Sequence, residues 1–145
     1  MENHPRITTF RGGYFFLSNF YPVGILWEGE HYPSSEHAYQ ASKTHYPAQR
    51  KQIALLSRPQ DAKRMGKHVV LRPHFDEIKV EIMRDILAVK FAVGMECAIM
   101  LERTGQAAIV HENYWHDYFW GVCNGQGEDW LGRLLIERRE ANRRL

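Results

Sequence analysis

The chain has 145 residues, of which 44% are hydrophobic, 12% aromatic and 25% charged. This length and composition fit one domain with an ordinary core, and they exclude a disordered polyelectrolyte. The longest apolar run is only a few residues, so we expect no membrane-spanning segment. The formal net charge of +2 gives no electrostatic reason to expect a nucleic acid partner. The two cysteines are too few for a disulfide framework, so we expect a cytoplasmic protein.

The first third of the chain predicts short strands followed by a helix. Residues 8–16 are rich in aromatic side chains and contain a glycine pair, which is typical of irregular structure or strand. A Glu-Gly pair between two short apolar pieces predicts a hairpin over residues 24–32. Ser34 or Ser35 can cap a helix that continues to Lys43 or slightly beyond.

The rest of the chain predicts mainly helices. Apolar residues recur every three or four positions in residues 75–93, which lays one apolar stripe along the longest predicted helix. The other expected elements are helices over 48–56, 59–66, 95–103 and from about 131 onward, and a short strand over 107–111. The predicted fold is therefore α+β and predominantly helical, a single domain over residues 1–145 with a few short strands near its N-terminus.

Three polar side chains share one stripe of the helix predicted after Ser34. At 100° per residue, Glu36, Gln40 and Lys43 lie within about 60° of one another. A carboxylate, an amide and an amine on one face are a candidate catalytic group. The alternative is a solvated face on which Glu36 and Gln40 are ordinary i,i+4 neighbours.

A second candidate site is the segment 117–132, which is rich in glycine and tryptophan. Its glycines permit positive φ and close approach of the backbone to a ligand, and its aromatic rings can stack on a flat ring. The free N–H groups of the helix that follows can face a phosphate. The alternative is an ordinary loop held by two buried tryptophans, Trp120 and Trp130.

No motif in the sequence binds a metal or a nucleotide cofactor. The eight histidines include no His-Glu-x-x-His pattern, and the two cysteines form no Cys-x-x-Cys pair. The glycine spacing is not that of a dinucleotide-binding loop, and neither a P-loop nor a Gly-x-Ser-x-Gly motif occurs. We therefore expect an activity that requires no metal and no cofactor.

Five segments occur in the order in which the YbiA-like, or NADAR, family has them. They are Leu17-Ser-Asn-Phe-Tyr-Pro22, Ser35-Glu-His-Ala-Tyr-Gln-Ala-Ser-Lys43, Ala62-Lys-Arg-Met-Gly66, Asp117-Tyr-Phe-Trp-Gly121 and Gly125-Gln-Gly followed by Leu131-Gly132. The chain resembles this family over nearly its whole length. The resemblance implies a compact, mainly helical α+β domain that hydrolyses N-glycosidic bonds without a metal. One branch acts on ribosylamino-pyrimidine phosphates of riboflavin biosynthesis, and another removes ADP-ribose from guanine.

The resemblance also implies roles for individual residues. The residues it places in catalysis are Glu36, Gln40, Lys43 and Asp117. The residues it places in substrate binding are Asn19, Phe20, His37, Trp120, Gly121, Gly127 and Arg139. The chain departs from the family at two positions: Asp129 stands where asparagine is usual, which puts the hydrogen bonding of the loop in doubt, and Phe75 where tryptophan is frequent.

The implied chemistry leaves two mechanisms open. Glu36 can stabilise positive charge at the anomeric carbon, and Lys43 can attack the open-chain sugar as an amine and form a Schiff base. The direction of the Lys43 pKa depends on whether burial or Glu36 dominates. Trp120 would stack on the base, and the glycine loop with Arg139 would hold a phosphate.

Two classes of function compete with an enzyme. One is a module that binds ADP-ribose or a related nucleotide without turnover, for which the intact Glu36–Lys43 pair would be superfluous. The other is a structural interaction domain, which leaves the polar stripe unexplained. The expected partners are a small ribosyl-phosphate or ADP-ribosyl substrate and an ADP-ribosylated nucleic acid, with no membrane.

Overall fold

The computed structural model describes residues 5–145 of the chain. These residues form two compact units. The continuous unit comprises residues 19–90, and the discontinuous unit comprises residues 5–18 and 91–145. The expected single domain over 1–145 includes residues 1–4, which lie outside the described residues, and it stays a prediction. Within 5–145, no helix has the length and apolar character needed to span a membrane.

The continuous unit begins with a β-hairpin. Strand β2 (Pro22–Trp27) pairs antiparallel with β3 (Glu30–Ser34). The two residues between them, Glu28 and Gly29, have φ of 47° and 82°. Positive φ at both positions is typical of the tight turn whose twist matches the flanking strands. The hairpin predicted from the Glu-Gly pair is therefore confirmed.

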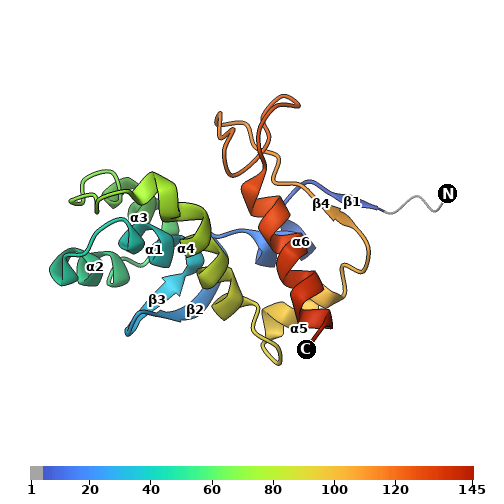
Figure 1. Ribbon diagram of the computed structural model, residues 1–145, viewed down its shortest axis with the longest axis horizontal. Helices are drawn as coiled ribbons and strands as arrows, with labels where there is room; N and C mark the ends of the chain where they lie inside the picture. Colours follow the sequence, from blue (N-terminus) through green and yellow to red (C-terminus); the bar gives the residue numbers. More distant parts are fainter. Residues whose placement is uncertain (1–4) are drawn as a thin grey trace. The chain divides into compact units, whose positions relative to one another are not determined.

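Four helices complete the continuous unit: α1 (Ser35–Ser42), α2 (Pro47–Ala54), α3 (Pro59–Met65) and α4 (Phe75–Lys90). Helix α1 packs against the other three helices and against both strands (Figure 1). All eight of its residues are buried. This burial excludes the solvated face that was the alternative interpretation of its polar stripe.

Helix α4 is shorter than its apolar pattern predicts. It ends at Lys90, whereas the prediction continued to Val93. Val93 is 62% exposed, and Gly94 turns the chain at φ 92°. The helix ends earlier because the last apolar residue of the predicted stripe has no core to pack against.

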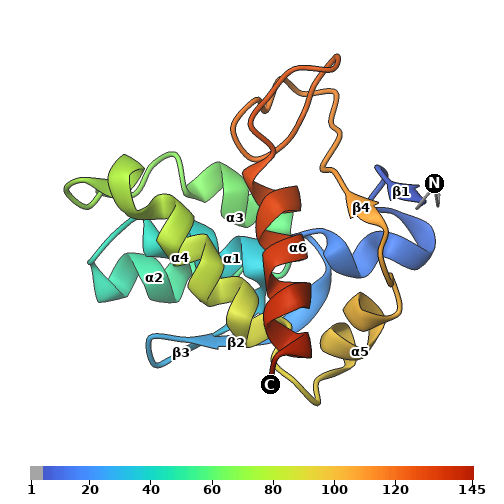
Figure 2. The ribbon, with the colours of Figure 1, turned by 45° about the vertical axis from the view of Figure 1, so that its right-hand side comes forward.

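The discontinuous unit contains a parallel pair of short strands, β1 (Arg6–Ile7) and β4 (Ala108–Ile109). Its helices are α5 (Glu96–Glu102) and α6 (Trp130–Arg143), and α6 packs against β4 and α5 (Figure 2). Residues 12–17 form a 3-10 helix, η1 (Gly12–Leu17), where the sequence suggested strand or irregular structure. Gly12 starts this turn at φ 55°, and Phe16 and Leu17 are buried at its end. The predicted class, mainly helical α+β, is confirmed.

Candidate active site

The start of α1 is fixed by a capping serine and a buried histidine. The Ser34 hydroxyl accepts a hydrogen bond from the His37 backbone N–H at 3.2 Å and lies 2.6 Å from His37 Nδ1. His37 Nε2 lies 2.9 Å from the Leu56 carbonyl oxygen. Burial lowers the pKa of His37, so the ring is neutral, with Nε2–H donating to Leu56 and Nδ1 accepting from Ser34. The predicted contact of His37 with substrate is untested, and both ring nitrogens already have partners.

Asn19 connects the segment before the hairpin to the first turn of α1. Its carbonyl oxygen accepts from the Glu36 N–H at 3.0 Å, and its side-chain Oδ1 accepts from the Ser35 hydroxyl at 2.9 Å. The first bond satisfies one of the N–H groups that a helix N-terminus leaves open, and the second ties the side chain of Asn19 to the same turn. Asn19 therefore positions Glu36, and its predicted contact with substrate, like that of the half-buried Phe20, stays a prediction.

Glu36 and Gln40 form a direct buried pair on α1. Gln40 Nε2 donates to Glu36 Oε1 at 2.7 Å, and the two side chains are only 4% and 8% exposed. A buried carboxylate is costly unless it is hydrogen-bonded, and a bond to a charged group is among the stronger ones. The spacing of the sequence thus predicted a real contact, and the pair holds the carboxylate in one orientation.

Gly66, the residue that ends α3, makes room for Gln40. A Cβ atom at Gly66 would lie 1.8 Å from Gln40 Oε1. No side chain larger than hydrogen fits there while Gln40 keeps its position. The sequence predicts Gly66 only as a helix stop and part of a family motif, because nothing local shows that α3 ends against α1.

Lys43 follows α1 and lines a pocket of about 340 Å³. The other residues of this pocket are Tyr39, Gly66, Lys67, Val69, Leu71, Phe75, Asp76 and Lys79. The Lys43 amine lies 5.7 Å from the centre of the Tyr39 ring, and the ring of Phe75 lies 5.8 Å from that of Tyr39. Phe75 therefore keeps an aromatic wall where the family often has tryptophan.

The environment of Lys43 favours the neutral amine. Burial lowers the pKa of Lys43, and the neighbouring Lys63, Lys67 and Lys79 lower it further, whereas Glu36 raises it. Burial is the largest of these effects. From the sequence, either burial or Glu36 could dominate the pKa of Lys43. Burial dominates, and a lowered pKa is the condition for a nucleophilic lysine.

Asp117 and Trp120 belong to a loop of the discontinuous unit that is tied by side-chain bonds. Asp117 Oδ1 accepts from the backbone N–H groups of Phe119 and Trp120 at 3.2 and 2.9 Å. The rings of Phe119 and Trp120 meet edge to face at 4.8 Å. Asp117 thus shapes the loop that carries Trp120, and the catalytic and stacking roles predicted for the two residues are untested.

The two glycines predicted to approach the substrate are packed against protein. A Cβ atom at Gly121 would lie 2.3 Å from the His111 carbonyl oxygen, and one at Gly127 would lie 2.2 Å from the Gly121 carbonyl oxygen. Gly127 also has φ 141°. These contacts favour the packing interpretation of the loop, and the predicted contact of Gly121 and Gly127 with a ligand stays a prediction.

Arg139 does not present its guanidinium to solvent. It is 3% exposed, and its Nη1 donates to the Thr104 hydroxyl at 2.8 Å. Burial is the main cause of a lowered pKa at Arg139. The side chain fixes α6 to the turn after α5. The expectation that Arg139 holds a phosphate with the glycine loop stays a prediction.

Asp129 replaces the usual asparagine without losing the hydrogen bonds of the loop. Its Oδ1 accepts from the His111 N–H at 2.9 Å and from the Gly132 N–H at 3.3 Å, so it caps α6. Its φ of 54° lies in the left-handed region that asparagine adopts more readily than most residues. Burial raises the pKa of Asp129, and these two bonds lower it.

The predicted site residues thus fall into two groups. The continuous unit holds Asn19, Phe20, Glu36, His37, Gln40 and Lys43, and the discontinuous unit holds Asp117, Trp120, Gly121, Gly127 and Arg139. In the second group, Arg139 lies in α6, whereas the other four residues lie in the loop before α6. Among residues 5–145, no three or more His, Cys, Asp or Glu side chains are arranged to hold a metal ion.

The NADAR domain family model matches residues 9–143 of the chain. The chain belongs to the NADAR family. It is 37% identical over 127 residues to the N-glycosidase YbiA of Shigella sonnei, covering 86% of this chain and 79% of that protein. It is 33% identical over 135 residues to an N-glycosidase of Nostoc punctiforme, covering 89% of this chain and 86% of the relative.

Two further NADAR matches are a larger protein and a solved structure. A riboflavin biosynthesis protein of Vibrio vulnificus is 34% identical over 128 residues, which are 86% of this chain and 35% of that protein. The NMR structure of the Escherichia coli protein YbiA superimposes with a TM-score of 0.84 at 32% identity, covering 97% of this chain and 86% of that one. The family and fold implied by the sequence motifs are therefore confirmed.

Proposed function

We propose that this chain hydrolyses the N-ribosidic bond of either a ribosylamino-pyrimidine phosphate or an ADP-ribosylated guanine. The observation that carries the proposal is the lysine amine with a lowered pKa in a pocket, at the end of the helix that holds the buried Glu36–Gln40 pair. The names of the N-glycosidase and riboflavin biosynthesis relatives support it. An ADP-ribosylated nucleic acid as partner and a cytoplasmic location stay predictions.

The relatives confirm the class of enzyme. Relatives that share about a third of their residues with this chain, over most of both lengths, are named N-glycosidases. The chain is accordingly a hydrolase that acts on N-glycosyl bonds. This result disfavours a module that binds ADP-ribose without turnover.

Glu36 supplies the negative charge that the reaction needs. Cleavage of an N-ribosidic bond develops positive charge at the anomeric carbon, which a positioned carboxylate stabilises. Gln40 holds Glu36 Oε1, and Asn19 holds the Glu36 backbone. The carboxylate is therefore oriented before substrate arrives, which reduces the cost of reorganisation in the transition state.

Lys43 supplies the nucleophile. Its neutral Nζ attacks C1 of the open-chain, protonated imine form of the ribosylamine, and a C1–Nζ bond forms. The bond between C1 and the nitrogen of the base then breaks, and that nitrogen leaves as an amine with the proton given up by Nζ. Water hydrolyses the remaining Schiff base, which returns the lysine and releases the sugar as an aldehyde.

The decisive experiment offers the protein both types of substrate. A ribosylamino-pyrimidine 5-phosphate and an ADP-ribosylated guanine oligonucleotide are incubated separately with the full chain, and the products are analysed by mass spectrometry. Release of ribose 5-phosphate or of ADP-ribose identifies the substrate. If neither product forms above the rate of spontaneous decay, the proposed function is wrong.

A further inference from the structure

Three lysines from three separate elements line the pocket beside α1. Lys43 follows α1, Lys67 follows the end of α3, and Lys79 lies in the second turn of α4. The Arg72 N–H donates to the Lys43 carbonyl oxygen at 2.7 Å, which joins the segment after α3 to the end of α1. These three lysines come from separate parts of the chain, so they are not simply the solvated face of one helix.

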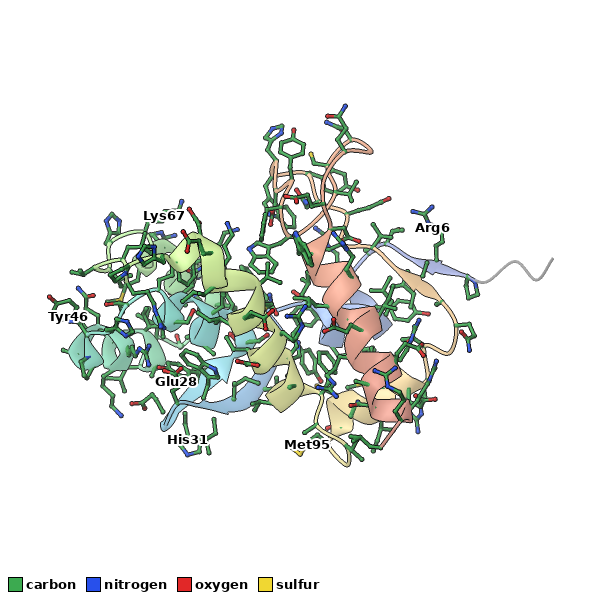
Figure 3. The ribbon with its side chains drawn as sticks, viewed as in Figure 1. Arg6, Glu28, His31, Tyr46, Lys67 and Met95 are labelled. Carbon is green, nitrogen blue, oxygen red and sulfur yellow. The ribbon has the colours of Figure 1, made fainter. Side chains whose placement is uncertain are left out.

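The lining carries more positive than negative charge. The one carboxylate among the lining residues, Asp76, lies 3.2 Å from the Lys79 amine, and its side chain is 89% exposed. Lys67 lies at the surface of the continuous unit (Figure 3), whereas the side chain of Lys79 is only 20% exposed. Because like charges held together repel, such a pocket is completed by an anion.

The remaining walls are apolar and the volume is small. Tyr39, Val69, Leu71 and Phe75 supply aromatic and aliphatic surface next to the amines. The volume of about 340 Å³ stands near the lower end of the range of roughly 300–1,000 Å³ for ligand pockets. A single sugar with one phosphate matches this volume and the combination of apolar walls with amines. ADP-ribose is a far larger molecule.

We propose that Lys67 and Lys79 bind the terminal phosphate monoester of the substrate sugar, so that the pocket selects a ribosyl 5-phosphate over an ADP-ribosyl group. This inference rests on the proposed function for the identity of the sugar. A monoester is close to a dianion at neutral pH, so two ammonium groups neutralise it. The two negative charges of the phosphate offset the positive charges of Lys67 and Lys79, so burial remains the main cause of the lowered pKa of Lys43 when the substrate is bound.

The test measures binding of the product separately from turnover. Ribose 5-phosphate, ribose and ADP-ribose are titrated by calorimetry into the full chain and into Lys67→Ala and Lys79→Met, the second of which keeps the aliphatic stem. Lys51→Ala is the matched control, since Lys51 is an exposed lysine of the same unit that pairs with Glu30 outside this pocket. We expect ribose 5-phosphate to bind roughly 10- to 100-fold more weakly to each pocket variant and unchanged to the control.

The outcomes separate this inference from the proposed function. Weaker binding of ribose 5-phosphate in the pocket variants supports the phosphate site even if no N-riboside is cleaved. Unchanged binding in both variants overturns the site even if the wild type cleaves a ribosylamine. The inference is also wrong if ADP-ribose binds more tightly than ribose 5-phosphate and is the ligand whose affinity the two substitutions reduce.

Discussion

Gln40 Nε2 donates to Glu36 Oε1 at 2.7 Å inside the helix that packs against every other element of the continuous unit. The bond has two consequences. It fixes the carboxylate toward one side of α1, and it makes the orientation of Glu36 depend on the space that Gly66 leaves for Gln40. Catalysis by Glu36 is therefore sensitive to changes in residues that touch no substrate.

Glu36→Gln should lower turnover by about 100-fold or more and leave the fold intact, because the amide keeps an oxygen for Gln40 but loses the charge. Turnover is measured with whichever substrate is cleaved, and folding by circular dichroism and thermal melting. A folded variant with nearly wild-type turnover would remove Glu36 from the mechanism.

Lys43→Ala should abolish turnover, and Lys43→Arg should not restore it, because a guanidinium forms no imine. Borohydride reduction in the presence of substrate should add the mass of the sugar to the peptide that contains Lys43. If Lys43→Arg keeps most of the activity and no adduct is trapped, the lysine acts only through its charge.

The lowered pKa of Lys43 also predicts a pH dependence. The neutral amine is the reactive form, so kcat/KM should rise with pH and level off below the ordinary lysine pKa of 10.5. Lys63 lowers the pKa of Lys43 and does not line the pocket, so Lys63→Ala should move this rise to higher pH. A shift to lower pH would contradict the described electrostatics.

Activity should persist after exhaustive treatment with a chelator, because the proposed steps use only a carboxylate, an amine and water. The assay compares turnover before and after dialysis against EDTA, and then after addition of zinc or magnesium. A loss that either metal restores would show that the site has been misinterpreted.

Gly66→Ala should reduce both stability and turnover, because its Cβ would overlap Gln40 Oε1. Overpacking of this kind costs about 1–3 kcal/mol, and displaced Gln40 would no longer orient Glu36. Gly24→Ala is the control in the same unit, since its Cβ would meet no atom within 4 Å. Equal effects of the two substitutions would refute the role given to Gly66.

Asp129→Asn should raise the melting temperature at pH 7, because asparagine oxygen can accept from His111 and Gly132 without burying a charge. Burial raises the folded-state pKa of Asp129 above its unfolded value, so the folded state binds the proton more tightly. The stability of the wild type should therefore gain from this group as pH falls from neutral toward about 4, and the variant should lack that gain.

Asp129→Ala provides the comparison, with an expected loss of about 1 kcal/mol from the missing cap. The melting temperatures of the wild type, Asp129→Asn and Asp129→Ala are measured at pH 7 and at pH 5. If Asp129→Asn is as unstable as Asp129→Ala at pH 7, the charge of Asp129 itself stabilises the loop, contrary to this prediction.

Local features of the sequence predicted local structure well. The Glu-Gly turn, the Ser34 cap and the contact of Glu36 with Gln40 all follow from spacings of a few residues. The motifs also predicted the family. What spacing cannot show is burial, and for this reason the direction of the Lys43 pKa stayed open.

Long-range packing accounts for the rest of what the sequence missed. The family resemblance implies Arg139 at a phosphate, and nothing local in the sequence shows that its guanidinium is buried against Thr104, 35 positions away. No spacing in the sequence links Lys67 and Lys79 to Lys43, because only the fold brings the three lysines to one pocket. The need for glycine at position 66 depends on Gln40, which lies 26 positions earlier in the chain and occupies the space of a Cβ atom.

The pairing of β1 with β4 has a consequence for synthesis on the ribosome. Ile7 pairs with Ile109 in a parallel ladder, so β1 cannot pair until β4, about a hundred residues later in the chain, has been synthesised. At roughly 5–20 residues per second, that delay is on the order of 5–20 s. Residues 19–90 emerge entirely within this interval, so we expect the continuous unit to fold co-translationally while the earlier segment is still unpaired.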